Sequence, residues 1–357
     1  MFSSIISTLI NILLFIFILG ILVFVHELGH FLTAKKSGVH IYEFSIGMGP
    51  LIKSIKGKDG ISYSIRALPL GGYVQMAGEI YEDDDSKKIP KEKFMCNRPW
   101  WQRLIILCAG VFNNFLLALV LLFTMALIWG ARSFEPVVDS VSEDGAAAEA
   151  GMKAGDLITK INGQKVNTWD KAQLLLIVKD KDGVYDIEVK HEDGETETLN
   201  IEPKTEKDEK GNEIKVFGIT AKSEVVKGFI PSVKYAFKKL VTTMEQMWLT
   251  IVNLFTGGIS VNALSGPVGI YSIVGESRSA GIQSVLFLIA YLSINLGVMN
   301  ILPIPALDGG HVLFLIIEMI TRKKVNAKVE SIATTIFFGL LILLMLYVTV
   351  HDIIRLF

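Results

Sequence analysis

Two histidines spaced four residues apart are the strongest chemical feature of the sequence. They belong to His26-Glu27-Leu28-Gly29-His30, which directly follows an apolar run and matches the pattern HExxH. On a helix, residues four apart share a face, so both imidazoles can bind one metal ion. Glu27 is then placed to take a proton from a water held by the metal. The alternative, that this segment is only the polar end of a membrane helix, is disfavoured because such ends usually carry Lys or Arg.

Two histidines do not complete a catalytic zinc site, which usually has three protein ligands and an open position for water. The other histidines of the chain are His40, His191, His311 and His351. Asp308 is the stronger candidate, because Pro303 and Pro305 interrupt a helix just before it and Gly309–Gly310 follow it. A broken helix at membrane depth is tolerated where it lines a cavity or is buried in protein. We therefore expect the Asp308 carboxylate to face inward.

The composition indicates a membrane protein. Of the 357 residues, 51% are hydrophobic and 20% charged, and the mean hydropathy is +0.46. These values exclude a disordered chain, a collagen-like repeat and a disulfide scaffold. The 35 Lys and Arg residues against 36 Asp and Glu residues give a net charge of −1. This balance offers no basic surface for nucleic acid, and none is expected as a partner.

Four apolar segments reach the length of about 20 residues that a membrane-spanning helix needs. They are Ile5–Val25, Leu104–Trp129, Ile282–Ile304 and Ile332–Val350. Basic residues cluster after the first segment and before the second, and again between the third and fourth. Cytoplasmic loops carry such an excess, so these two loops are expected inside and both chain termini outside the cell membrane.

Phe229–Phe255 is a fifth apolar segment, but charged residues interrupt its first half. Its apolar residues recur at helical spacing, which predicts an amphipathic helix lying on the outer surface of the membrane. If this segment crossed the membrane instead, the third span would be inverted. Asp308 would then lie on the opposite side from HELGH, so a fifth crossing and the metal site exclude each other.

Two regions between the apolar segments read as β or mixed structure. Ile41–Ile46, Leu51–Ile55 and Ile61–Ala67 are expected as short strands, with a hairpin turn at Lys58-Asp59-Gly60. Residues 134–221 alternate expected strands and helices. The strands are Val137–Val141, Asp156–Ile161, Tyr185–Lys190 and Glu195–Ile201, and the helices are Ala146–Ala150 and Asp170–Val178.

The metal motifs resemble those of a known family. HELGH, together with NxxxxNxLPxPxLDGG over Asn295–Gly310, is similar to the motifs of the site-2 protease family of intramembrane zinc metalloproteases (family M50). Gly71–Gly78 (GGYVQMAG) and Ser265–Ile270 (SGPVGI) resemble segments of its bacterial RseP-like branch with a single PDZ domain. The resemblance covers nearly the whole chain. Val111 stands where relatives often have proline, so the resemblance assigns no role to Asn113 or Asn114.

The resemblance implies a Zn²⁺ site whose ligands are His26, His30 and Asp308. It also implies that Glu27 is the catalytic base and that Asn295 and Asn300 bind the substrate backbone. The β region would be a sheet dipping toward the membrane, whose free edge pairs with an unwound substrate. An ordinary cytosolic hairpin is the alternative. The chemistry favours the sheet, because a helical peptide bond must be extended before water can attack it.

The segment Glu149–Gly163 resembles part of a bacterial circularly permuted PDZ domain. PDZ domains bind extended peptides by strand addition. No carboxylate-binding GLGF-type loop is evident in the sequence, and Val216–Ile219 is a weak candidate for the corresponding strand. Peptide binding and a passive size filter are therefore equally favoured for this domain.

Together these features predict a polytopic α-helical membrane protein with four transmembrane helices, a membrane-associated β-sheet and an inserted extracytoplasmic PDZ-like α+β domain. The expected parts are 1–38 (first membrane helix with HELGH), 39–100 (β region and basic loop), 101–131 (second membrane helix), 132–222 (PDZ-like domain), 223–281 (surface helix and SGPVGI), 282–320 (third membrane helix with LDGG) and 321–357 (fourth membrane helix).

The expected function is zinc-dependent intramembrane endoproteolysis of single-span membrane proteins in a bacterial cell membrane. Anti-sigma factors, pheromone precursors and remnant signal peptides all fit as substrates, and membrane lipid is the other expected partner. The alternative is a PDZ-bearing membrane scaffold with a structural or degenerate metal site, against which the intact Glu27 argues. A metal transporter is disfavoured because the second and fourth apolar segments lack the necessary polar residues.

Overall fold

The computed structural model describes residues 2–78, 89–177, 183–207, 213–222, 224–259 and 264–355. The chain forms two compact units. The first contains residues 1–121 and 264–357, and the second contains residues 122–263. The residues of both metal motifs belong to the first unit.

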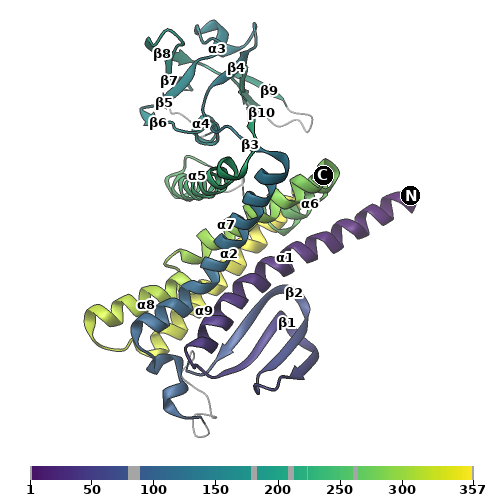
Figure 1. Cartoon of the computed structure of the whole chain (residues 1–357), viewed down its shortest axis with the longest axis vertical. Coiled ribbons are helices and arrows are strands. Elements are labelled where there is room, and N and C mark those ends of the chain that lie inside the picture. The colour runs from purple at the N-terminus through teal and green to yellow at the C-terminus, as the bar shows by residue number, and fades with distance from the viewer. Residues whose placement is uncertain are drawn as a thin grey trace. The chain divides into compact units, whose positions relative to one another are not determined.

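Four helices of the described residues are long and apolar enough to cross a membrane, as the sequence predicted (Figure 1). They are α1 (Phe2–Lys36), α2 (Trp100–Trp129), α7 (Ile282–Ile301) and α9 (Ala327–Ile354). Helix α1 continues through HELGH without interruption, so His26 and His30 lie one turn apart on a single helix.

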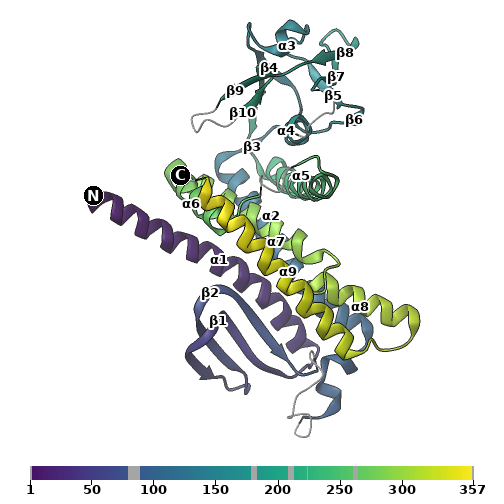
Figure 2. The ribbon, with the colours of Figure 1, turned by 180° about the vertical axis from the view of Figure 1, so that it is seen from behind.

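Within the first unit, the middle of α1 packs on two other helices. Ile18 and Leu22 of α1 are buried with Val274 of α6 (Pro267–Ala280) and Leu288 of α7. Figure 2 shows α9 in front of α7 in the view from behind. Helix α1 also approaches α2 closely, because a Cβ added at Gly29 would lie 2.3 Å from the Ala109 carbonyl oxygen.

The last four residues of the SGPVGI segment form the first turn of α6. Pro267 occupies its first turn, where no backbone N–H is needed. The buried carboxylate of Asp352, on α9, accepts a hydrogen bond from the Gly269 N–H at 2.8 Å. A negative charge at a helix N-terminus is favourable, so this motif and Asp352 together fix α6 against α9.

The helix is interrupted between α7 and α8 (Asp308–Thr321), as the two prolines predicted. Helix α7 ends at Ile301, three residues before the expected end at Ile304. Leu302 precedes Pro303 and adopts an extended conformation, because a residue before proline disfavours the helical one.

The glycines after Asp308 allow α8 to start directly beneath the end of α7. A Cβ at Gly309 would lie 2.3 Å from the carbonyl oxygens of Ile301 and Leu302. A Cβ at Gly310 would lie 2.3 Å from the Ile304 carbonyl oxygen. Only glycine fits at these two positions, which explains the LDGG motif in steric terms.

The β region differs from the expected three short strands, and that prediction was wrong in its boundaries. The first two expected strands are one strand, β1 (Ile41–Lys56), and the third extends into β2 (Ser62–Met76). Residues 43–46 of β1 lie between two segments of β2. They pair with 72–75 on one side and with 62–65 on the other, so the long hairpin folds back on itself. Gly47 and Gly49 have φ values of 87° and 79°, which lets β1 bend without ending.

This folded hairpin packs on α1. Phe44 of β1 makes edge-to-face contacts with Phe24 and Phe31 of α1, with ring centroids 6.0 Å and 5.1 Å apart. All three belong to or pack against one buried cluster that also contains Ile106 of α2. The cluster holds the sheet against the half of α1 that carries HELGH.

Two short 3₁₀ helices, η2 (Lys91–Lys93) and η3 (Met95–Asn97), precede α2.

The second unit contains a four-stranded sheet in the order β6-β5-β7-β8 and several two-stranded pairs. Its strands are β3 (Ala131–Arg132), β4 (Val138–Val141), β5 (Leu157–Ile161), β6 (Gln164–Lys165), β7 (Tyr185–Lys190), β8 (Thr196–Ile201), β9 (Lys204–Lys207), β10 (Glu213–Val216), β11 (Ile219–Ala221) and β12 (Val225–Val226). Its helices are α3 (Ala146–Glu149), α4 (Trp169–Ile177) and α5 (Phe229–Thr256). The expected strands and helices are present, and position 178, the expected end of α4, lies outside the described residues.

One strand of this unit was predicted wrongly. Val216–Ile219 is not a single strand, because Gly218 has a φ of 77° and separates β10 from β11.

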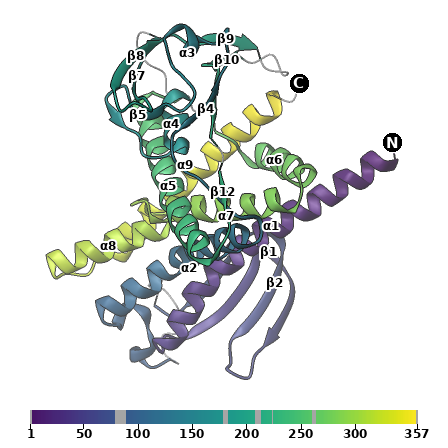
Figure 3. The ribbon, with the colours of Figure 1, turned by 45° about the horizontal axis from the view of Figure 1, so that its top comes forward.

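The core of the second unit lies on the apolar face of the four-stranded sheet, where Tyr185, Ile187 and Ile158 are 0% exposed. Figure 3 shows α4 beside α5, where the Gln246 amide donates a hydrogen bond to the Asp170 carbonyl at 2.8 Å.

Candidate metal centre

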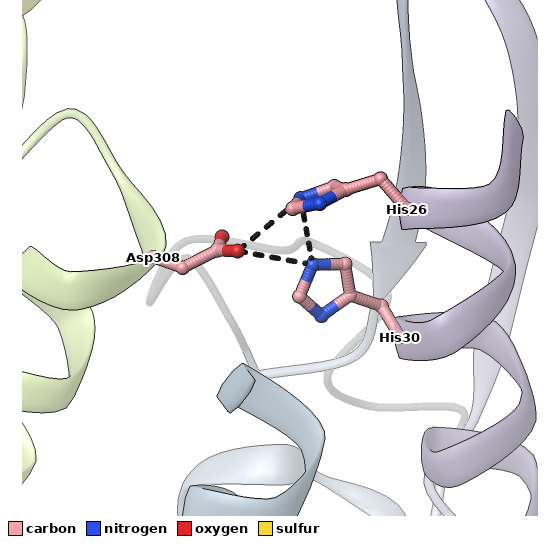
Figure 4. Close-up of side chains that lie close together, drawn as sticks. All are labelled: His26, His30 and Asp308. Atoms are coloured by element: carbon pink, nitrogen blue, oxygen red, sulfur yellow. Dashed lines mark hydrogen bonds and ion pairs between the residues drawn. The ribbon is translucent and has the colours of Figure 1, made fainter. Parts of the chain in front are cut away.

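Three side-chain atoms from α1 and α8 converge on one point (Figure 4). The Nε2 atoms of His26 and His30 lie 3.2 Å apart, and Oδ2 of Asp308 lies 3.2 Å and 3.4 Å from them. In a tetrahedral zinc site with bonds of about 2.0–2.1 Å, neighbouring ligand atoms are about 3.3–3.4 Å apart. The triangle therefore has the dimensions of one face of a zinc coordination sphere.

The chemical types of these three side chains also fit a bound cation. Both histidines are 7% exposed, and Oδ2 of Asp308 is buried without a hydrogen-bond partner of suitable angle, although both ring nitrogens are close to it. Two imidazoles and one carboxylate are a common protein ligand set for catalytic zinc. A zinc ion would therefore be held by His26, His30 and Asp308.

The other histidines proposed as third ligands do not join this group. His311 contacts Glu330 at 3.1 Å, and Nδ1 of His191 contacts Asp156 at 2.7 Å. The hydrogen bonds to Asp156 and Glu197 raise the pKa of His191 above its ordinary value. Within the described ranges, no second cluster of three metal-binding side chains is present.

Helix α2 orients one of the two imidazoles. Nδ1 of His30 lies 2.8 Å from the backbone carbonyl oxygen of Ile106. A carbonyl only accepts, so the proton is on Nδ1 and the lone pair of Nε2 points to the converging group. Metal-binding histidines commonly donate their second N–H in this way, which fixes the ring.

Gly110 of α2 lies directly against both rings. A Cβ at this position would be 2.3 Å from Nε2 of His30 and 2.7 Å from Cε1 of His26. Even a methyl group would therefore overlap the atoms that face the metal position. The absence of a side chain at residue 110 is a condition for the two imidazoles to converge.

Gly110→Ala is expected to weaken zinc binding at least about tenfold, as the loss of a supporting contact does, because both rings must turn away. Zinc affinity of the purified protein, measured by competition with a chelator, checks this. Gly20→Ala on α1 is the matched control, since a Cβ there would meet nothing within 4 Å. Equal affinity in both variants would contradict the steric argument.

Glu27 lies beside the converging group but is not part of it. Its position on α1 follows directly after His26. A Cβ at Gly72 of β2 would lie 3.2 Å from Cγ of Glu27 and 3.1 Å from Val23. The glycine in the GGYVQMAG segment therefore lets strand β2 approach the glutamate side chain closely.

Asn295 and Asn300 both lie on α7, before the break that leads to Asp308. Five residues on a helix turn by about 140°, so their side chains leave α7 in different directions. Oδ1 of Asn295 is buried and has no hydrogen-bond partner among the described residues. A buried amide oxygen without a partner is unusual in a folded protein and needs an explanation.

The contributions of α2 were not identified from the sequence. The Ile106 acceptor is a backbone carbonyl, for which no residue type is a signal. Gly110 was visible as a glycine inside an apolar helix, which costs about 1 kcal/mol relative to alanine and usually has a packing reason. That signal could have pointed to a close contact at this position.

Comparisons with known proteins show what the whole chain is similar to. A family model described as peptidase family M50 matches residues 14–344. The regulator of sigma-W protease RasP of Bacillus subtilis is 35% identical, covering 97% of this chain and 99% of its own length. Zinc metalloprotease RasP of Bacillus licheniformis is 32% identical with coverage of 97% and 99%. A protein of Clostridium acetobutylicum is 38% identical, with coverage of 96% and 97%.

Proposed function

The chain belongs to peptidase family M50 and is a zinc metalloendopeptidase, and on this premise we propose that it cleaves single-span membrane proteins within the bilayer. The observation that carries the proposal is the convergence of His26, His30 and Asp308. His26 and His30 lie on a helix apolar enough to span a membrane. Polar and ionisable groups are costly in such a helix, so their presence there indicates function.

We propose His26, His30 and Asp308 as the zinc ligands and Glu27 as the catalytic base. Zinc, when bound, polarises the scissile carbonyl and makes water a better nucleophile at neutral pH. Glu27 takes the proton of the attacking water and delivers it to the nitrogen of the leaving amine. The buried position of the two imidazoles supports this assignment, because a dry site strengthens the electrostatic interactions on which it depends.

A peptide bond inside a helix is sterically hidden, so the substrate must be extended before water can attack it. Segment 72–76 of β2 pairs with β1 along one side, and Gly72 brings it against Glu27. We propose that an unwound substrate pairs with the other side of this segment by strand addition. The amides of Asn295 and Asn300 would then hydrogen-bond to the substrate backbone.

The site and the relatives support one class of substrate. The Bacillus subtilis relative is named as a regulator of sigma-W protease, which supports anti-sigma factors as substrates. Pheromone precursors and remnant signal peptides present the same single apolar span and fit the same site. Membership in a peptidase family argues against a scaffold with a degenerate metal site.

Cleavage of a single-span protein by the purified enzyme in liposomes tests the proposal. The products are expected to end inside the apolar span, because the catalytic residues lie on an apolar helix. Mass spectrometry of both fragments gives the cleaved bond. A chelator should stop the reaction and added zinc should restore it. Product ends confined to the water-exposed flanks would contradict intramembrane cleavage.

We propose that residues 132–222 form a PDZ-like domain outside the cell and that both termini are also outside. We also propose that the chain is divided into the seven parts expected from the sequence, from the first membrane helix (1–38) to the fourth (321–357). The sheet β6-β5-β7-β8 with its buried apolar face supports an independent domain. An impermeant thiol reagent should label a cysteine at Ser142 in intact cells, and one at Lys323 only after lysis. Labelling of both in intact cells would contradict this topology.

A further inference from the structure

We propose that Asn114 is the hydrogen-bond acceptor that orients the His26 imidazole toward zinc. The inference rests on the metal site proposed above. The Asn114 side chain lies on α2, is 0% exposed, and its amide is 3.1 Å from Nδ1 of His26. Asn114 does not contact the converging atoms itself, so it acts as a positioning residue through the ring.

The direction of this hydrogen bond follows from the ring. Nε2 of His26 faces His30 and Asp308, and a neutral imidazole that binds zinc through Nε2 carries its proton on Nδ1. The group beside Nδ1 must therefore accept. In the structure the amide nitrogen of Asn114 faces Nδ1, while its oxygen is buried without a partner among the described residues.

A half turn of the amide exchanges these two atoms without changing the shape of the side chain. The oxygen and nitrogen of an asparagine are distinguished only by their hydrogen bonds. With the oxygen beside the ring, the Nδ1–H and Oδ1 pair with each other, whereas the opposite orientation leaves both unpaired. We therefore assign Oδ1 of Asn114 as the acceptor in the zinc-bound protein.

The spacing along α2 supports the assignment independently. Ile106, Gly110 and Asn114 follow one another at intervals of four residues and so lie along one side of the helix. Ile106 accepts from His30, Gly110 contacts both rings, and Asn114 contacts His26. One side of α2 thus provides an acceptor for each imidazole, with the glycine between them.

The position of Asn114 is fixed from its other side. The Ser293 hydroxyl of α7 donates a hydrogen bond of 2.8 Å to the Asn114 backbone carbonyl, and Ser293 is 0% exposed. The neighbouring Asn113 differs, because its amide donates to the Val25 backbone carbonyl at 3.1 Å. Asn113 therefore contacts the backbone of α1, which makes it the matched control.

Zinc affinity tests the proposal without any need for activity. In purified, detergent-solubilised protein, Asn114→Leu is expected to weaken zinc binding about 10–100-fold, the usual effect of losing such a partner. Asn114→Asp keeps an acceptor and should bind zinc within about threefold of the wild type. Asn113→Leu should bind like the wild type. Visible absorption of the Co²⁺-loaded protein should change in Asn114→Leu alone, because it reports ligand geometry.

His26→Ala separates failure of this inference from failure of the metal site. If His26→Ala binds zinc as the wild type does, the proposed metal site is wrong. If His26→Ala loses zinc but folded Asn114→Leu does not, only the role of Asn114 is wrong. Should Asn114→Leu fail to fold, Asn114→Asp decides: near-native zinc affinity supports the assignment, and a loss beyond about tenfold overturns it.

Discussion

Replacing Glu27 by Gln is expected to slow peptide cleavage about 10²–10⁴-fold, the usual contribution of general acid–base catalysis, while zinc binding stays unchanged. Gln has the same shape as Glu, so the contact of residue 27 with Gly72 of β2 is preserved. Its amide cannot take a proton from water. The three converging atoms of His26, His30 and Asp308 are untouched, so the metal should be retained.

The measurement combines metal analysis with cleavage of a single-span substrate in liposomes. Glu92→Gln is the matched control, because Glu92 is exposed on η2 and the chemical change is identical. It should cleave at the wild-type rate. A zinc-loaded Glu27→Gln protein with a rate within about tenfold of the wild type would show that another group accepts the proton.

The convergence of His26, His30 and Asp308 could be predicted from local rules. The four-residue spacing of His26 and His30 has meaning only on a helix, and the apolar run before them indicates one. Proline and glycine flank Asp308 and mark the break between α7 and α8. That Asp308 reaches the histidines depends on which membrane face each helix end occupies, and the positive charges of the loops indicated this.

The hydrogen-bond partners that α2 provides for the two histidines could not be predicted in the same way. The acceptor for His30 is the Ile106 carbonyl, and every residue has such a carbonyl. Whether it faces a histidine depends on the rotation and height of α2 relative to α1. Both depend on tertiary contacts between the two helices, such as the close approach of Gly29 to Ala109. Asn114 was visible in the sequence, but its partner was determined only by this packing.

In the β region, the strands could be predicted from the sequence but the way they fold back on one another could not. Alternating residues predicted strands at 41–46, 51–55 and 61–67, and the hairpin turn between β1 and β2 is where the sequence placed it. The folding of β1 over β2 was not predicted, because a glycine in a strand pattern is consistent with both a strand end and a bend. At Gly47 and Gly49 the chain bends and continues.

Asp308→Asn is expected to lower the zinc affinity more than about 100-fold, beyond the effect of losing a supporting partner, since a neutral amide is a poor zinc ligand. Cleavage should fall in proportion to zinc occupancy. The change is isosteric, and Asp308 is at the start of α8, where the close contacts of Gly309 and Gly310 are unaffected. Zinc content after purification and chelator competition provide the measurement.

The control must separate loss of a ligand from general destabilisation of a helix start. Asp352→Asn serves, because the buried carboxylate of Asp352, near the end of α9, also lies at a helix N-terminus, that of α6. Loss of its charge should lower the stability by about 2 kcal/mol, the upper value for a shielded charge at a helix N-terminus, and leave zinc binding intact. Asp308→Asn should instead lose zinc, and excess zinc should restore part of its activity, which no addition of metal can do for Glu27→Gln. If Asp308→Asn binds zinc as tightly as Asp352→Asn, Asp308 is not a ligand, and its 3.2 Å approach to His26 is only an ion pair.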